Sequence, residues 1–306
     1  MSDLPPDLPL GLKHTEGRNT RLATAIASGQ IVTAPGAFDC IGARLVEVAG
    51  FDAVYVTGSG VSMSLLGAPD VGVVSFAEMA DAVARIADAV SIPVIADADT
   101  GYGGTANIFR TVRSYERAGV SAIQIEDQDW PKKCGHEPGR RLVPIAEATA
   151  RIAAAAAARH DPRMQIIART DARSMEGLDA ALERAARYRD AGADVLFVES
   201  PESAEELAQI PLALGAPCLA NMVEGGRTPI VGVPALQQMG FAIAIFPNAL
   251  TRLFARTGLA LLDELSRTGT TAGFADRMLD HRGLWDLFEN PKWTALDARF
   301  RPETNT

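Results

Sequence analysis

Eight short apolar segments recur along the chain, each separated from the next by a longer amphipathic stretch. Each segment is rich in Val, Ile, Leu or Ala, and its apolar residues are consecutive rather than alternating. This pattern is typical of strands that are buried on both faces of a sheet. The predicted strands are Ile31–Ala34, Ala53–Thr57, Pro93–Asp97, Ala122–Glu126, Gln165–Arg169, Val195–Glu199, Pro217–Ala220 and Ala242–Phe246. The repetition predicts a parallel α/β architecture.

The stretches between these strands carry helical signals. Apolar residues recur about one turn apart in Phe76–Val90 and Glu176–Ala191, and the run Ala153–Ala158 is read as a packed helix. Gly119 and Gly192 are placed to end helices just before the following strands. Eight alternations without a break in composition favour a (β/α)₈ TIM-type barrel over two domains. A doubly wound sheet is the alternative, but no Gly-x-Gly-x-x-Gly turn follows the first strand.

The chain continues well beyond its eighth predicted strand. Helices are expected at Leu250–Leu265 and Phe274–His281, which is more helix than an eighth barrel unit needs. Further apolar residues follow at Leu284, Trp285, Leu287 and Phe288. We therefore expect one barrel domain over residues 1–306, with 1–17 as an N-terminal extension. The C-terminal helical segment, 248–306, is expected to pack on a neighbouring subunit.

Charge and composition narrow the class of partner. The 306 residues carry a formal net charge of −9, and the isoelectric point is near 5.0. This acidity argues against nucleic acid or an anionic membrane as a partner and leaves small-molecule chemistry open. The sequence has neither a long apolar run nor the pattern of a signal peptide. Its three widely spaced cysteines suggest a reducing compartment, so a cytoplasmic location is expected.

Polar residues gather where the predicted strands end. The third strand ends at Asp97 and Asp99, and the fourth at Glu126. The fifth to seventh lead to Arg169, Glu199 and Asn221. A single acid in such a place is usually a helix cap, but barrel active sites form where several strand ends meet. Because Mg²⁺ prefers oxygen ligands, Asp97, Asp99 and Glu126 are candidate metal ligands.

A second cluster, Lys132–His136, follows the fourth predicted strand. Two lysines and a histidine beside the thiol of Cys134 are expected to lower its pKa and favour the thiolate. Cys40 and Cys218 have no such neighbours and are read as small buried apolar residues. No cysteine spacing of the zinc-binding kind is present.

These residues belong to a set of motifs in a recognisable order. The motifs are Gly36–Asp39, Tyr55–Val61, Leu66–Asp70, Asp97–Gly103, Ile125–Gln128, Lys132–His136, Ile167–Asp171 and Asn221–Gly226. Over roughly Thr33 to Trp285 the chain resembles the isocitrate lyase / phosphoenolpyruvate mutase superfamily. The resemblance implies a β/α barrel whose last helix is exchanged between subunits, usually in a homotetramer.

The resemblance also implies a cofactor and a substrate site. Mg²⁺, with Mn²⁺ as the alternative ion, would lie near Asp97, Asp99 and Glu126, with Asp70 in its outer shell. The implied substrate-binding residues are Thr57, Gly58, Ser59, Gly135, Arg169, Glu199, Asn221 and Arg252. Thr57 stands where many members have serine; the hydroxyl is retained and a methyl group is added.

Two motifs bear on the reaction. Members of the superfamily that cleave a carbon–carbon bond carry a Lys-x-Cys-Gly-His loop, which is intact here at Lys132–His136. The chain is therefore similar to the methylisocitrate lyases and the 2-alkylmalate lyases. Asn221–Gly226 is more similar to the alkylmalate, decarboxylase and mutase branches, so the two motifs leave the substrate open.

The expected reaction is Mg²⁺-dependent cleavage of a 2-hydroxy di- or tricarboxylate to a 2-oxo acid, such as pyruvate, and a carboxylic acid. Cys134 would protonate the carbanion, and His136 and Lys132 would tune the thiol and bind the leaving acid. Tyr55 and Glu199 are the two candidates for the base. The alternatives are an oxaloacetate decarboxylase or hydrolase, a phosphonate mutase, and a non-catalytic barrel that binds a metal or a carboxylate.

Overall fold

The computed structural model describes residues 8–9, 17–135, 137 and 139–301. Its strands are β1 (Val32–Ala37), β2 (Val54–Val56), β3 (Val94–Asp97), β4 (Ala122–Glu126), β5 (Gln165–Thr170), β6 (Val195–Val198), β7 (Leu219–Asn221) and β8 (Ile243–Phe246). All eight predicted strands are confirmed, with ends shifted by a few residues. The second strand stops before Thr57 because that side chain accepts a hydrogen bond from Gly60 N and caps the next helix.

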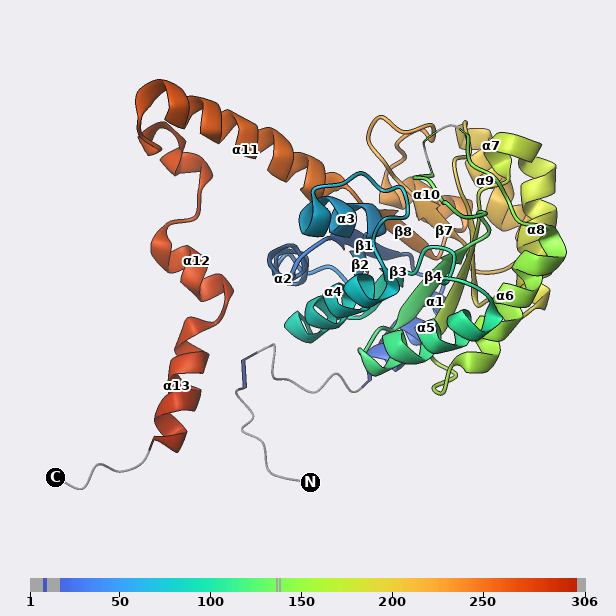
Figure 1. Cartoon of the computed structure of the whole chain (residues 1–306), viewed down its shortest axis with the longest axis horizontal. Coiled ribbons are helices and arrows are strands. Elements are labelled where there is room, and N and C mark those ends of the chain that lie inside the picture. The colour runs from blue at the N-terminus through green and yellow to red at the C-terminus, as the bar shows by residue number, and fades with distance from the viewer. Residues whose placement is uncertain (1–7, 10–16, 136, 138, 302–306) are drawn as a thin grey trace.

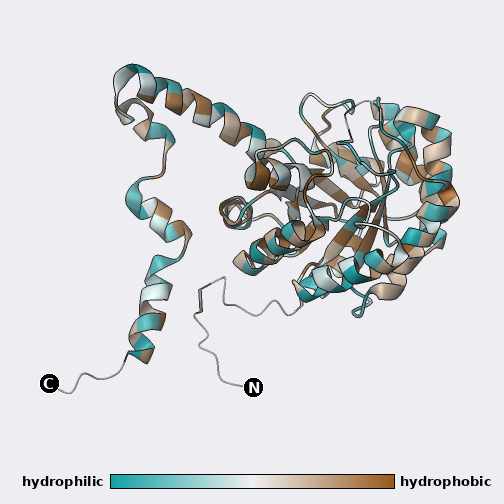
Figure 2. Ribbon diagram, in the orientation of Figure 1, coloured by the Kyte–Doolittle hydropathy of each residue, from teal (hydrophilic) through white to brown (hydrophobic). Residues whose placement is uncertain are grey.

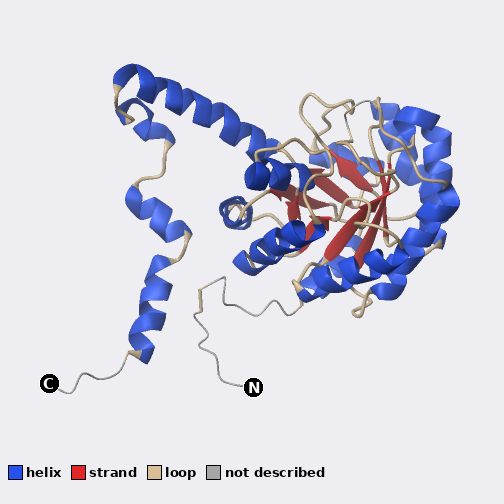
Figure 3. Ribbon diagram, viewed as in Figure 1, coloured by secondary structure: helices blue, strands red, loops and turns tan. Residues whose placement is uncertain are grey.

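The strands form one parallel sheet in the order β6-β5-β4-β3-β2-β1-β8-β7. A parallel bridge between Leu196 and Cys218 joins β6 to β7, so the sheet closes on itself. Side chains on both strand faces are buried, as their continuous apolar sequences predicted. Figure 3 shows the strands surrounded by helices. The predicted TIM-type (β/α)₈ barrel is confirmed.

One helix precedes β1, and the helices that follow it up to β8 connect one strand to the next. They are α1 (Arg18–Ala27), α2 (Cys40–Val48), α3 (Gly58–Leu66), α4 (Phe76–Ala89), α5 (Thr105–Arg117), α6 (Ile145–Ala158), α7 (Arg173–Glu176), α8 (Leu178–Asp190), α9 (Ala204–Leu214) and α10 (Val233–Met239). The helix predicted at Phe76–Val90 is confirmed and begins with a capping box formed by Ser75 and Glu78. The helix predicted at Glu176–Ala191 is interrupted at Gly177, whose φ of 92° is not helical.

After β8 the chain forms α11 (Ala249–Thr268), a 3₁₀ helix (Ala272–Arg277), α12 (His281–Leu287) and α13 (Asn290–Phe300). The helix predicted at Leu250–Leu265 is confirmed. The α-helix predicted at Phe274–His281 is wrong, because the chain becomes extended at Met278 and α12 starts only after the Asp280 cap. Figure 1 shows these C-terminal helices as an arm that leaves the barrel, and Arg44 Nη2 on α2 donates a 2.8 Å hydrogen bond to Leu287 O of α12.

The arm exposes an unusual amount of apolar surface. Within α11, α12 and α13 no residue is buried, and Phe254 and Leu259 are 70% and 68% exposed. Figure 2 shows hydrophobic residues along α11, which lies outside the barrel. Among all the described helices, none combines the length and the apolar character that crossing a membrane would require.

Candidate active site

A pocket lies at the carboxyl ends of the strands, the end at which β/α barrels carry their functional loops. Most residues that the sequence singled out line it: Tyr55, Thr57, Ser59, Asp70, Asp97, Glu126, Lys132, Cys134, Gly135, Arg169, Glu199 and Asn221. Arg252 lines an adjoining outer chamber, which Cys134 also borders. His136 lies outside the described residues.

Three buried carboxylates lie at the ends of β3 and β4. Asp97, Asp99 and Glu126 are each less than a tenth exposed. Burial raises the pKa of Asp97, raises that of Asp99 to about 6, and raises that of Glu126 well above its usual range. Gly58 allows this packing, because a Cβ there would lie 2.7 Å from Asp97 Oδ2. The pocket wall is therefore strongly acidic and closely packed.

Lys132 offsets part of this negative charge. Its Nζ lies 2.5 Å from both Asp70 Oδ1 and Asp99 Oδ1. Burial lowers the pKa of Lys132, but the carboxylates of Asp99 and Asp70 outweigh that effect and hold it well above its ordinary value. Lys132 is therefore charged at neutral pH, and its ion pairs join the loop after α3 to the loop after β4.

The oxygen donors at this mouth are of the type that Mg²⁺ prefers. In the part of the chain that the structure describes, no three His, Cys, Asp or Glu side chains converge closely enough to enclose an ion. That spacing is compatible with Mg²⁺, which usually takes one or two carboxylates and completes its shell with water and substrate oxygens. The best-placed donors are Asp97 and Glu126, whose Oε1 has no hydrogen-bond partner among the described residues.

The thiol loop, which follows β4 and carries Cys134, lines the pocket with Lys132, Lys133, Cys134 and Gly135. An antiparallel bridge between Gln128 and Leu142 closes its base. Within it, the Gln128 side chain forms two 2.9 Å hydrogen bonds with the backbone of Lys133. Beside Cys134, a Cβ on Gly135 would overlap Nη2 of Arg169. Only glycine allows the loop to approach the arginine this closely.

The other two cysteines differ from each other. Cys218 is fully buried, as predicted, and burial raises the pKa of its thiol to about 12. Cys40 was also predicted to be buried, but it is only half-buried, with its Sγ 3.5 Å from Arg85 O. That prediction is wrong because Cys40 opens α2 at the protein surface rather than lying on a strand.

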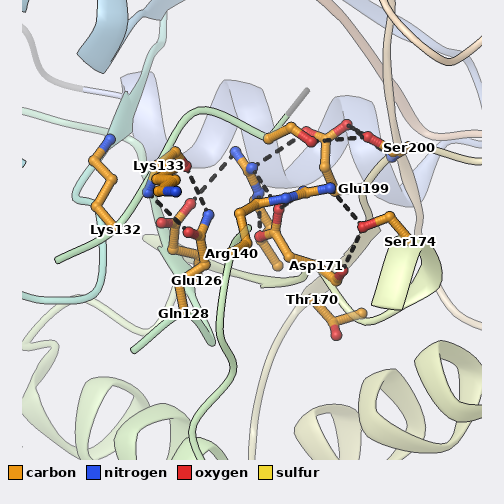
Figure 4. Close-up of polar contacts among 12 residues, drawn as sticks. Glu126, Gln128, Lys132, Lys133, Arg140, Thr170, Asp171, Ser174, Glu199 and Ser200 are labelled. Atoms are coloured by element: carbon orange, nitrogen blue, oxygen red, sulfur yellow. Dashed lines mark hydrogen bonds and ion pairs between the residues drawn. The ribbon is translucent and has the colours of Figure 1, made fainter. Parts of the chain in front are cut away.

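Arg169 is surrounded by carboxylates. Its Nε and Nη2 donate 3.0 Å hydrogen bonds to Asp171, and Glu126 and Glu199 each approach its guanidinium to 3.5 Å. Burial lowers the pKa of Arg169, but Asp171 and the other carboxylates raise it well above its ordinary value. The guanidinium lies over the Phe197 ring, 5.2 Å from its centre. Figure 4 shows part of this network.

Glu199 is held in place by backbone and side-chain donors. Its Oε1 accepts a 2.7 Å hydrogen bond from Ser200 N, and its Oε2 accepts one of 3.0 Å from Asn221 Nδ2. Tyr55 donates a 3.0 Å hydrogen bond to Gln124 Oε1. Burial, assisted by nearby carboxylates, raises the Tyr55 pKa well above its ordinary value. Tyr55 is therefore a hydrogen-bond donor at neutral pH rather than a base.

The sequence interpretation missed some residues of the pocket. Asn248 lines it, and its Oδ1 accepts hydrogen bonds from Ser59 Oγ at 3.0 Å and Thr57 Oγ1 at 3.4 Å. Its position just after β8 follows the same strand-end rule that found Asp97, so this rule would have found it. Phe197 carries no comparable signal, because an apolar strand residue looks the same whether it faces the core or the pocket.

Fold and site together define a β/α-barrel enzyme whose acidic, thiol-containing pocket lies at the carboxyl ends of the strands. The phosphoenolpyruvate phosphomutase family model matches residues 22–265. The chain belongs to this family, which confirms the predicted resemblance.

Similar proteins include lyases. The chain is 45% identical to 2,3-dimethylmalate lyase of Eubacterium barkeri, covering 87% of this chain and 92% of the relative. It is 40% identical to 2-methylisocitrate lyase of Aeropyrum pernix, covering 90% of this chain and 89% of that relative. A crystal structure of 2,3-dimethylmalate lyase superimposes with a TM-score of 0.88 at 37% identity, covering 92% and 95%. The crystal structure of phosphonopyruvate hydrolase in complex with oxalate and Mg²⁺ superimposes with a TM-score of 0.84 at 29% identity, covering 92% of this chain and 99% of the hydrolase.

Proposed function

We propose that the protein is a Mg²⁺-dependent carbon–carbon lyase. It cleaves a 2-hydroxy di- or tricarboxylate of the 2-alkylmalate or methylisocitrate type into a 2-oxo acid, such as pyruvate, and a carboxylic acid. The observation that carries the proposal is the position of Cys134 beside Arg169 and the buried carboxylates, in a chain whose relatives include lyases. A reducing compartment such as the cytoplasm would keep this thiol reduced.

Asp97 and Glu126 would hold the Mg²⁺ directly, while Asp70 and Asp99 would bind its water ligands. When bound, the ion would supply Lewis-acid stabilisation of negative charge on the substrate oxygens. The fork of Arg169 would bind a substrate carboxylate. The amino end of α3, at Gly58 and Ser59, would add the positive end of a helix dipole.

Bond cleavage needs a base and an acid on the protein. A base takes the proton of the 2-hydroxyl group, the C2–C3 bond breaks, and its electrons remain on the departing carbon. Glu199 is better suited than Tyr55 to be the base, since the raised pKa of Tyr55 keeps its hydroxyl protonated. Cys134 then donates a proton to the departing carbanion. The closed loop keeps water away from that carbanion.

Activity is expected to require a divalent cation. Incubation with 2-alkylmalates, methylisocitrate, isocitrate and oxaloacetate, followed by mass detection of the products, should identify one substrate that is cleaved to a 2-oxo acid. Excess chelator should abolish this cleavage, and Mg²⁺ should restore it. Full turnover in excess chelator would contradict the proposed role of the metal.

Hydrolysis or decarboxylation of oxaloacetate, phosphonate mutation, and binding without catalysis are the alternatives. Hydrolysis and decarboxylation of oxaloacetate also leave a carbanion that must be protonated, but the resemblance associates the thiol loop with the lyases, so none of these alternatives is expected to depend on Cys134. A screen in which only oxaloacetate or a phosphonate reacts would favour the first two. Metal or carboxylate binding without any product would favour the third.

We further propose that residues 1–306 form one barrel domain whose C-terminal segment, 248–306, packs against another copy in a closed oligomer, a homotetramer by resemblance. The exposed apolar side chains of α11 motivate this, because contiguous apolar surface of this kind usually marks an interface.

Sedimentation is expected to give a stable oligomer at micromolar concentration. Phe254→Glu should shift it toward smaller species, because it places a charge on the exposed apolar face of α11. Asp263→Lys, a charge change elsewhere on α11, serves as the control. A wild-type protein that sediments as a monomer would contradict the proposed packing.

A further inference from the structure

The loop that carries Cys134 is anchored by an arginine that none of the motifs includes. Arg140 lies six positions after Cys134 and is only 7% exposed. Its Nη1 donates to Asp171 Oδ1 and its Nη2 to Ser174 Oγ, as Figure 4 shows. Both acceptors follow β5, the strand that carries Arg169. A side chain of the thiol loop therefore reaches the structure that supports the carboxylate-binding arginine.

Asp171 is shared between two arginines. Oδ1 of this fully buried carboxylate accepts from both Arg140 Nη1 and Arg169 Nη2, while Oδ2 accepts from Arg169 Nε. Burial raises the pKa of Asp171, but Arg169 and Arg140 outweigh it and hold the pKa below its ordinary value. Asp171 is therefore ionised, and its position determines where the Arg169 guanidinium points.

Arg140 also changes the charge balance at the pocket. The carboxylates of Asp171, Glu126 and Glu199 surround Arg169. Lys132 is already paired with Asp70 and Asp99, so without a cation on Asp171 an incoming anion would meet more negative charge around Arg169, in a buried setting where screening is weak. Arg140 supplies that cation without entering the pocket.

We propose that Arg140 is a positioning residue that anchors the Cys134 loop to Asp171 and thereby sets the orientation and available charge of Arg169. When the loop is seated, Arg140 reaches Asp171, Asp171 fixes Arg169, and Gly135 lies directly against the Arg169 guanidinium. The acid and the carboxylate-binding group are thus brought into place together. The catalytic meaning of this coupling rests on the proposed lyase function, whereas the coupling itself does not.

The test uses two measurements that do not need turnover. The first is the affinity for oxalate in the presence of Mg²⁺, measured by calorimetry. The second is the rate at which iodoacetamide alkylates Cys134, followed by peptide mass mapping so that Cys40 and Cys218 are scored separately. Arg140→Met should weaken oxalate binding about tenfold, because a buried charge-assisted contact is lost. In this variant iodoacetamide should also alkylate Cys134 several-fold faster, because the loop has lost its anchor and exposes the thiol more often.

Arg140→Lys keeps the charge but not the two-pronged geometry, so it should recover part of the affinity and most of the protection of Cys134. Arg159→Met is the matched control. Arg159 pairs with Asp194 beside the opposite end of β5, and its loss should leave both measurements at their wild-type values. If Arg140→Met fails to fold, Asp171→Asn breaks the same contact and should give the same faster alkylation of Cys134, whereas the loss of a negative charge beside Arg169 should not weaken oxalate binding.

A folded Arg140→Met protein with wild-type oxalate affinity and wild-type alkylation would overturn the inference. So would equal effects of Arg140→Met and Arg159→Met, since these would indicate a general loss of stability. If the wild-type protein binds oxalate but cleaves none of the 2-hydroxy acids, the proposed function fails, while the two measurements still decide whether Arg140 positions Arg169.

Discussion

Cys134→Ser is expected to lower kcat by roughly 100-fold or more, within the range that general acid catalysis usually contributes. Serine keeps the size and approximate shape of the side chain, but its hydroxyl is a far weaker acid than a thiol. KM should change much less, because Arg169 and the metal site would still bind the substrate carboxylates. Steady-state kinetics on the substrate found by the screen will separate the two parameters.

Cys40→Ser and Cys218→Ser are the controls for this experiment. Cys40 lies at the start of α2 and Cys218 lies in the barrel wall, so neither borders the pocket. Both variants should retain nearly wild-type kcat. Wild-type turnover by Cys134→Ser on every substrate that undergoes C–C cleavage would show that the thiol is not the acid, and the hydrolase or decarboxylase alternative would then come first.

Asp97→Ala is expected to lower the rate of cleavage by roughly 100-fold or more. The reason is that the lost metal contribution amounts to several kcal/mol of charge stabilisation. It should also abolish the stabilisation by Mg²⁺. In the wild type this should reach about 2.7 kcal/mol when free Mg²⁺ stands at about 100 times its dissociation constant. Thermal unfolding with and without Mg²⁺ measures that gain independently of the reaction.

The metal-free protein should respond in the opposite direction. Burial raises the pKa of Asp97 above its value in the unfolded chain, so the ionised carboxylate opposes folding once the pH rises above that unfolded value. Asp97→Ala removes this cost, and without Mg²⁺ at neutral pH its Tm should equal or exceed that of the wild type. The exposed Asp81→Ala is the control, for which both Tm values should stay unchanged. A marked loss of metal-free stability would indicate that Asp97 has a structural role instead.

Much of this protein can be predicted from local sequence. A strand buried on both faces must be apolar at consecutive positions, so the eight runs identified all eight strands. Parallel strands in a closed barrel end at the same mouth, which is why the sequence alone groups Asp97, Glu126, Arg169 and Asn221. The family follows from motifs whose order along the chain is itself a sequence property.

Helix boundaries outside the barrel were less predictable. At Phe274–His281 the spacing of apolar residues is compatible with a helix, but the cap formed by Asp280 starts a new helix and Met278 is extended. Local periodicity describes which face of a segment can be buried. It does not specify where the chain must turn to reach its packing partner.

Only the tertiary structure decided how the loops meet. The pairing of Lys132 with Asp70 and Asp99, and that of Arg140 with Asp171, link residues on different loops that no periodic pattern relates. Long polar side chains can reach many partners, and the one chosen depends on how the closed loop lies over the barrel mouth. The sequence therefore determined the barrel and the chemical groups at its mouth, because these follow from periodicity and strand direction. The tertiary structure determined which charges neutralise one another, because that depends on distances across the closed barrel.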